Sequence, residues 1–116
     1  HLLTEGVRER LMADVPFGVF LSGGVDSSAI TALVRRLHSG ALRTFSVGYA
    51  HDPEHSELGP ARRVAERFGT EHREVVIDHD DLLAYVPELI HAQDEPLADW
   101  VCIPLYYVSK LVRDSG

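Results

Sequence analysis

The stretch that decides the fold is Val19-Phe20-Leu21-Ser22-Gly23-Gly24-Val25-Asp26-Ser27-Ser28. Three apolar residues, typical of a buried strand, run into a Ser-Gly-Gly turn, and a helical pattern opens directly after it. Glycines adopt backbone conformations that other residues avoid, and without a Cβ they let an anion approach the backbone. Such a turn at a helix N-terminus directs N–H groups at one point, where serine hydroxyls add further donors. We therefore predict a phosphate site formed by Ser22, Gly23, Gly24, Ser27 and Ser28.

Asp26 needs its own explanation, because a carboxylate by itself repels phosphate. Either it binds a divalent cation that bridges to the phosphates, or it caps the helix. The less specific alternative is an ordinary strand–turn–helix connection capped by Asp26 and Ser27. A Walker loop is excluded, since it requires a lysine in the turn and Lys110 is the only lysine of the chain. We favour the anion site.

Size and composition restrict the class of protein. A chain of 116 residues provides one domain with one core. The net charge of −7 argues against a nucleic-acid groove, and no apolar run approaches the ~20 residues of a membrane span. Cys102 is the only cysteine, so an internal disulfide is excluded, and no secretory signal is visible. These features favour a cytoplasmic enzyme with no nucleic-acid or membrane partner.

The remaining patterns predict an α/β fold with a parallel sheet. We expect strands near residues 18–22, 43–49 and 72–77, connected by a helix ending near Leu37 and another from Ala61 to Phe68. A strand–helix–strand unit of this kind makes a right-handed crossover, and ligands bind at the carboxyl ends of the strands. Val47 and Gly48 should therefore lie on the same rim as the Ser22 turn. Gly48 should permit a close backbone approach there.

Two loops are candidates for the same rim. In residues 50–60, His51 and His55 suggest a metal site, but a proline between them interrupts any aligning helix and no third ligand follows. We interpret this segment as an irregular polar loop. The second loop holds three carboxylates around a proline, and an ordinary acidic surface loop is the alternative to a role at the rim. Its candidate residues are Asp94, Glu95 and Asp99.

Three further helices complete the chain. An amphipathic helix begins near Leu2 and ends before Pro16. A helix over 82–90 carries Pro87 as a possible kink, and Asp78 and Asp80 are its expected caps. The last helix, near 103–112, has Pro104 in its first turn. Since the chain starts inside a helical pattern and stops at a helix end, we expect a piece truncated at its C-terminus.

The turn from Ser22 to Ser27 matches the Ser-Gly-Gly-x-Asp-Ser signature of the PP-loop in the ATP pyrophosphatase superfamily. Over all 116 positions, the chain resembles the N-terminal part of the synthetase domain of glutamine-hydrolysing asparagine synthase. The matching positions include residues 14–18, 44–48, 57, 61–62, 64–65, 69–72, 74–75, 94–99 and 103–104. The resemblance implies a Rossmann-like PP-loop ATP pyrophosphatase fold.

The resemblance implies an amidotransferase of the ligase class, active in asparagine biosynthesis with ATP and Mg²⁺. A carboxylate, aspartate first among the choices, is adenylated with release of pyrophosphate. Ammonia then displaces AMP to give the amide. In this family the ammonia comes from glutamine, hydrolysed by a separate glutaminase domain with a cysteine as its first residue. Cys102 does not fit that role, and we interpret it as a packed thiol. A homodimer is compatible with the resemblance.

The resemblance also implies roles for individual residues. The serines and glycines of the turn hold pyrophosphate, with Asp26 on magnesium, and main-chain groups of Leu21 and Val47 contact the adenine nucleoside. Phosphoryl chemistry is mostly positioning, so no proton-transferring catalytic residue is assigned. Leu58 and Pro60 stand where the family usually has serine and tyrosine, and we expect little consequence.

The family's second acidic segment, rich in Ser-Gly-Glu, should follow Gly116. We therefore expect these 116 residues alone to be inactive, with an open sheet edge and an apolar helix face near Leu111. Two alternatives stay open. One is a related amidotransferase acting on another carboxylate, and the other is a nucleotide-binding module without turnover.

Overall fold

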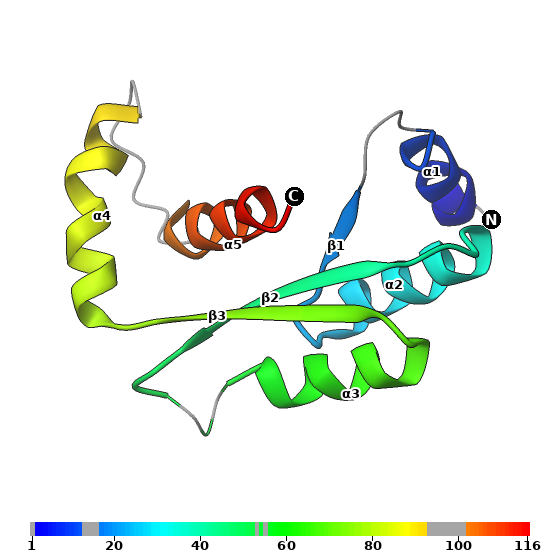
Figure 1. The fold of residues 1–116 in the computed structure, drawn as a ribbon, viewed down its shortest axis with the longest axis horizontal. Helices are drawn as coiled ribbons and strands as arrows, with labels where there is room; N and C mark the ends of the chain where they lie inside the picture. The colour runs from blue at the N-terminus through cyan, green and yellow to red at the C-terminus, as the bar shows by residue number, and fades with distance from the viewer. Residues whose placement is uncertain (1, 13–16, 53, 55, 93–101) are drawn as a thin grey trace.

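The computed structural model describes residues 2–12, 17–52, 54, 56–92 and 102–116. Helices and strands alternate along most of this length (Figure 1), which confirms the predicted α/β class. In chain order the elements are α1 (Leu2–Arg10), β1 (Gly18–Phe20), α2 (Val25–Leu37), β2 (Arg43–Tyr49), α3 (Leu58–Phe68), β3 (Glu71–Ile77), α4 (His79–Ala92) and α5 (Cys102–Asp114). Within these residues, no helix is both long enough and apolar enough to cross a membrane.

The three strands form one parallel sheet in the order β1-β2-β3. Its register aligns Phe20 with Phe45 and Phe45 with Arg73. β2 has the predicted bounds and β3 begins one residue before the predicted 72. β1 is shorter than predicted, because its pairing with β2 ends at Phe20 and residues 21 and 22 lie outside the strand. The chain therefore leaves the sheet early and enters the glycine turn.

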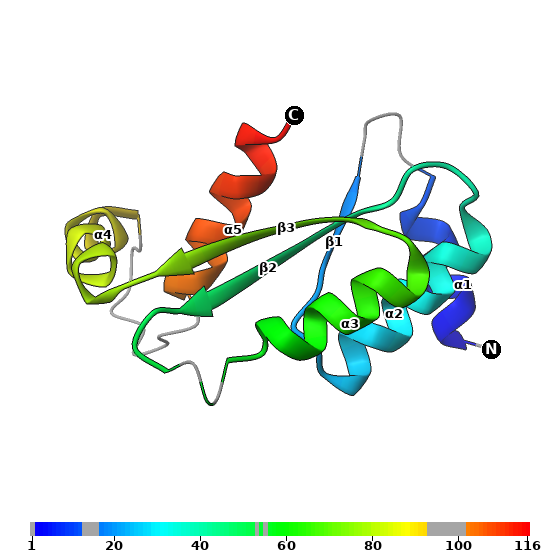
Figure 2. The ribbon, with the colours of Figure 1, turned by 60° about the horizontal axis from the view of Figure 1, so that its bottom comes forward.

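Helices cover both faces of the sheet. α2 and α3 contact each other on one face, whereas α5 lies against β2 and β3 on the other (Figure 2). Right-handed crossovers place both connecting helices on the same face when the strand order is sequential. α1 packs on α2, and α4 extends beyond the ends of the strands, where it contacts α5 (Figure 1). The sheet is thus enclosed between α5 on one side and α2 with α3 on the other.

Among the described residues, six buried apolar side chains group into two clusters. The first contains Val7, Val34 and Leu42, and the second contains Leu21, Ala61 and Ala65. Leu21 is 1% exposed, and burial of a leucine side chain stabilises a fold by ~1.5–3 kcal/mol. Because Leu21 is fixed against α3 immediately before the glycine turn, the turn begins from an anchored position.

The boundaries of α3 differ from the prediction. The helix begins at Leu58 rather than Ala61, so the interpretation of residues 50–60 as wholly irregular is wrong for the last three. Pro60 fits inside the first turn, because N–H groups there have no intrahelical acceptor. Leu58 is buried, at 7% exposed, and this burial favours the earlier start. At its other end α3 stops at Gly69, as predicted, with a φ of 61°.

The N-terminus of α4 is held by two aspartates that cap each other. The Asp81 N–H donates to Asp78 Oδ1 at 2.8 Å, and the Asp78 N–H donates to Asp81 Oδ2 at 2.9 Å. The predicted capping role of Asp78 is confirmed. Asp80, the other predicted cap, lies in the first turn of α4, and the residue that pairs with Asp78 is Asp81. α4 continues through Pro87 to Ala92, and Pro104 lies in the first turn of α5, as predicted.

Candidate functional site

The glycine turn connects the end of β1 to the start of α2. Gly24 is the N-cap of α2, with extended φ and ψ of −74° and 170°, so Asp26 lies at the second helical position. The alternative that Asp26 caps the helix is therefore wrong. Asp26 is exposed in the first turn, where the helix dipole favours a negative charge.

Serine hydroxyls close the turn. The Oγ atoms of Ser22 and Ser27 are 2.9 Å apart, and the Ser22 N–H donates to Ser27 Oγ at 3.2 Å. The Ser28 hydroxyl donates to the Gly24 carbonyl at 2.6 Å, and the Ser28 N–H donates to the same carbonyl at 3.1 Å. The N–H groups that precede Ser28 in the first turn have no intrahelical acceptor. Together with the Ser22 and Ser27 hydroxyls, they suit an anion.

Gly23 is required at this turn for two reasons. Its φ of +82° lies in the left-handed region that side chains disfavour. A Cβ added there would also lie 2.7 Å from both the Ala61 nitrogen and Pro60 Cβ. The turn therefore rests directly on the first turn of α3, with no room for a side chain.

A pocket of about 560 Å³ opens beside the turn. Its walls come from the ends of β1 and β2, from the turn, and from the first half of α5. Its described lining residues are Phe20, Leu21, Ser22, Ser27, Phe45, Ser46, Val47, Gly48, Tyr49, Asp52, Glu57, Pro104, Leu105 and Val108. Five predicted site residues are thus brought together: Leu21, Ser22, Ser27, Val47 and Gly48. Gly23, Gly24, Asp26 and Ser28 belong to the same turn without being among these lining residues.

The backbone of β2 forms one edge of the pocket. The Leu21 N–H donates to the Phe45 carbonyl at 2.8 Å, so Phe45 directs its carbonyl toward β1. Backbone groups alternate in direction along a strand, and Val47 therefore directs its N–H and carbonyl toward the same edge. β1 pairs with β2 only as far as Phe20. The main chain of Val47 thus faces the side of the pocket that β1 has left.

The close approach predicted at Gly48 is made by a side chain. A Cβ at Gly48 would collide with the side chain of Leu58, whose Cγ would be 2.7 Å away. Leu58 of α3 therefore packs over β2 at Gly48, while Pro60 lies against Gly23. Leu58 and Pro60, where we expect little consequence from the departure from the family pattern, thus both pack against glycines of the site.

Comparison with known proteins identifies the family. The family model described as asparagine synthase matches residues 1–116. The chain belongs to the asparagine synthase family. It is 39% identical over 106 residues to the glutamine-hydrolyzing asparagine synthetase 1 of Bacillus subtilis strain 168, covering 91% of this chain and 16% of that protein. The glutamine-hydrolyzing asparagine synthetase of Gallus gallus is 35% identical over 119 residues, covering 97% of this chain and 21% of that protein.

The fold has a counterpart among solved structures. The NH3-dependent NAD synthetase of Campylobacter jejuni, in complex with the nitrate ion, matches with a TM-score of 0.56 and 17% sequence identity. The match covers 98% of this chain and 48% of that one. This likeness concerns the fold alone, and it confirms the predicted α/β fold with a parallel sheet and flanking helices.

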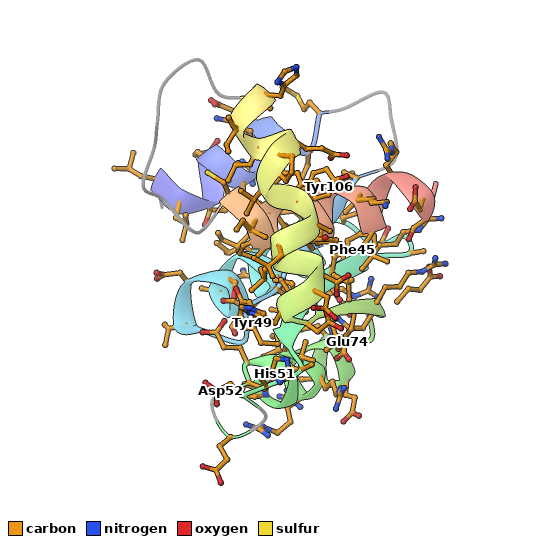
Figure 3. All side chains as sticks on the ribbon, turned by 90° about the vertical axis from the view of Figure 1, so that its left-hand side faces the viewer. Phe45, Tyr49, His51, Asp52, Glu74 and Tyr106 are labelled. Carbon is orange, nitrogen blue, oxygen red and sulfur yellow. The ribbon has the colours of Figure 1, made fainter. Side chains whose placement is uncertain are left out.

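In this member of the asparagine synthase family, the pocket has an acidic rim, formed by the end of β2 and the loop after it, which were both predicted to lie at this rim. Tyr49, Asp52 and Glu57 line it, and Figure 3 shows Tyr49 and Asp52 near the carboxyl end of β2. Burial, and then the Glu57 carboxylate, raise the pKa of the Tyr49 hydroxyl above its usual value. The usable signal was position, because Tyr49 ends the strand whose carboxyl end was predicted to carry the site, and Asp52 and Glu57 lie in the loop after it.

The described residues contain no group of three or more His, Cys, Asp or Glu side chains that could hold a metal ion. His51 lies at the same rim (Figure 3), and its partner in the rejected metal hypothesis, His55, is outside the described residues. The predicted rim residues Asp94, Glu95 and Asp99 also lie outside them.

Proposed function

We propose that this chain forms the N-terminal part of a synthetase domain that makes an amide at the expense of ATP, and that the whole protein converts aspartate to asparagine. The observation that carries the proposal is the Ser22 turn, which aligns hydroxyls and free N–H groups beside a pocket of about 560 Å³. Membership of the asparagine synthase family supports the same reaction.

In the proposed reaction, a carboxylate oxygen of aspartate attacks the α-phosphorus of ATP. The bond from that phosphorus to the bridging oxygen breaks, and pyrophosphate leaves with the electron pair. Ammonia then attacks the acyl carbon, AMP leaves, and the nitrogen loses a proton. A glutaminase domain in the whole protein supplies the ammonia, and we place the enzyme in the cytoplasm.

The residues of this chain bind and orient the nucleotide. The Ser22 and Ser27 hydroxyls and the first-turn N–H groups of α2 hold the pyrophosphate portion, and the main-chain groups of Leu21 and Val47 contact the nucleoside. Preorganised donors of this kind favour charge that develops on a leaving group. Phe20 and Leu105 give this side of the pocket an apolar wall.

Asp26 suits a magnesium ligand. Mg²⁺ binds through one or two carboxylates together with water and phosphate oxygens, so a single exposed carboxylate beside the turn fits it without a larger cluster. When bound, the ion would neutralise phosphate charge.

The test is aspartate-dependent exchange of labelled pyrophosphate into ATP, measured on the natural protein that carries this chain. We expect exchange in the wild type, a decrease of ~100-fold in Ser22→Ala, and no change in Ser39→Ala, an exposed serine in the loop after α2. Exchange with another carboxylate in place of aspartate would identify a different amidotransferase. ATP binding without exchange would contradict the proposal and indicate a nucleotide-binding module.

A further inference from the structure

Ser46 bonds to the point where the chain leaves the sheet. It lies in the middle of β2, is 3% exposed, and its hydroxyl donates a hydrogen bond to the Leu21 carbonyl. Leu21 is the residue directly before the Ser22 turn. Neighbouring parallel strands normally bond through their backbones. A buried side-chain donor at this carbonyl therefore marks a change in how β1 and β2 are joined.

The strand register shows what this hydroxyl replaces. β1 pairs with β2 as far as Phe20 and Phe45, and the Leu21 N–H still donates to the Phe45 carbonyl at 2.8 Å. If the parallel ladder continued, the Leu21 carbonyl would next accept the N–H of Val47. The Ser46 hydroxyl occupies that carbonyl instead.

We propose that Ser46 is a positioning residue for the nucleotide. Its hydroxyl ends the β1–β2 ladder at Leu21, fixes the direction in which the Ser22 turn leaves the sheet, and keeps the Val47 N–H available to the pocket. Leu21, Ser46 and Val47 all line that pocket. The inference rests on the proposed function only for the identity of the ligand, because the bond itself is a feature of the folded chain.

Thr44 provides a matched control. It lies two residues earlier on the same face of β2, is 0% exposed, and its hydroxyl is 2.8 Å from Thr70 Oγ1 and 2.9 Å from His72 Nδ1. Loss of this hydroxyl removes buried hydrogen bonds from the same strand without touching Leu21. Thr44→Val therefore shows how much stability is lost when a buried hydroxyl on β2 is removed.

The experiment compares Ser46→Ala, Ser46→Thr and Thr44→Val in the natural protein that carries this chain. The measurements are the Kd for ATP, the KM for ATP and kcat, and backbone hydrogen exchange over residues 19–28 without nucleotide. For Ser46→Ala we expect a Kd and KM about tenfold higher and faster hydrogen exchange at the turn, because the Leu21 carbonyl loses its buried donor and the turn its fixed direction. Ser46→Thr should restore both, and Thr44→Val should lower Tm with Kd unchanged.

The inference is overturned if Ser46→Ala matches the wild type in Kd and in hydrogen exchange at the turn, or if Thr44→Val shifts both equally. If the proposed function is wrong, the wild type itself should form no AMP from ATP and aspartate, which is a different result. The Kd and the hydrogen exchange still decide the role of Ser46 in that case, and hydrogen exchange alone decides it if ATP does not bind. If Ser46→Ala does not fold, Ser46→Cys, a weaker donor, should give the same changes in smaller degree.

Discussion

Gly23 is the residue at which the site tolerates least change. Its φ of +82° disfavours any side chain, and a Cβ would lie 2.7 Å from the Ala61 nitrogen. We expect Gly23→Ala to lower the free energy of unfolding by more than the ~1–2 kcal/mol of a left-handed alanine, because the turn must also move away from α3. Pyrophosphate exchange should be abolished.

Gly69 is the control for this substitution. Its φ is +61°, but no atom lies within 4 Å of the position that a Cβ would take. Gly69→Ala should therefore show the backbone cost alone, with pyrophosphate exchange unchanged. Thermal unfolding and pyrophosphate exchange are measured on both variants. Equal losses of stability and of exchange in Gly23→Ala and Gly69→Ala would show that the contact of the turn with α3 contributes to neither.

A substitution at Asp26 distinguishes a magnesium ligand from a residue with only a structural role. Since Gly24 is the N-cap, Asp26→Asn removes only a favourable charge from the first turn of α2. We expect Tm to change little and pyrophosphate exchange to fall by ~100-fold, with partial recovery at high Mg²⁺ concentration. Exchange at the wild-type rate would remove Asp26 from the site.

Among the elements, α3 is tied to the sheet by an ion pair. Arg62 Nη2 lies 2.7 Å from Glu74 Oε2, and Arg62 Nε donates to Glu74 Oε1 at 2.8 Å. The hydrogen bond from Arg62 is the main cause of a Glu74 pKa below its usual value. The pair is partly exposed, so water screens its contribution.

The lowered pKa of Glu74 determines how the stability of the fold changes with pH. The stabilisation by Glu74 is fully present above the unfolded pKa of about 4.5 and is lost as the pH falls through the lower folded value. Glu74→Gln should thus have a lower Tm than the wild type near neutral pH, and the difference should shrink in acid. Glu71→Gln, whose Arg43 partner is 3.6 Å away, is the control with a smaller difference. A Tm difference independent of pH would contradict the assignment.

The same elements show what could be predicted from the sequence. The Ser-Gly-Gly turn, the strands and the end of α3 at Gly69 follow from local signals, because apolar runs, glycines and their spacing belong to the chain itself. The start of α3 could not be predicted this way, since the burial of Leu58 depends on a contact with Gly48 in strand β2. The partner of Asp78 was also missed, because Asp80 and Asp81 carry the same local signal.

At the site, the turn residues could be predicted one by one, whereas for the loop at the rim only the segment could be predicted. Ser22 and Ser27 are adjacent to the strand that identifies them and Tyr49 is the last residue of β2, whereas Asp52 and Glu57 reach the pocket through the path of a loop. The Ser46 hydroxyl was missed for a related reason, since a serine inside a strand gives no signal until its neighbour across the sheet is known.

For the whole molecule, exposed large apolar side chains lie on several of the described elements, and α4 carries Leu83, Val86 and Ile90. Leu83 is 58% exposed and Ile90 69% exposed, whereas Leu111, where we had expected the apolar face, is half-buried. We expect the isolated 116 residues to self-associate, as sedimentation would show, and Leu83→Lys with Ile90→Lys to reduce this.

The matched control adds two lysines to exposed positions of the same helix without removing a large apolar side chain. Ala84→Lys with His91→Lys serves this purpose, and this pair should lower the association less than the pair at Leu83 and Ile90. Equal effects of the two pairs would show that added charge alone disperses the chains. Unchanged association in both would place the contact elsewhere.

The chain covers 16% of the Bacillus subtilis relative, and we propose that the rest of the site lies in residues outside it. The isolated 116 residues should then bind ATP weakly and form no AMP with aspartate and ammonium, whereas the natural protein should form it. Comparable AMP formation by both would mean that the proposed division of the site is wrong.

The most direct test of the central claim is the transfer of oxygen from aspartate to AMP in the natural protein. The side-chain carboxylate of aspartate is labelled with oxygen-18, and the products formed from ATP and ammonia are analysed by mass spectrometry. If the carboxylate attacks the α-phosphorus, each AMP released should carry one oxygen-18 atom and the asparagine should retain the other. Unlabelled AMP, or ADP in place of AMP, would contradict the account.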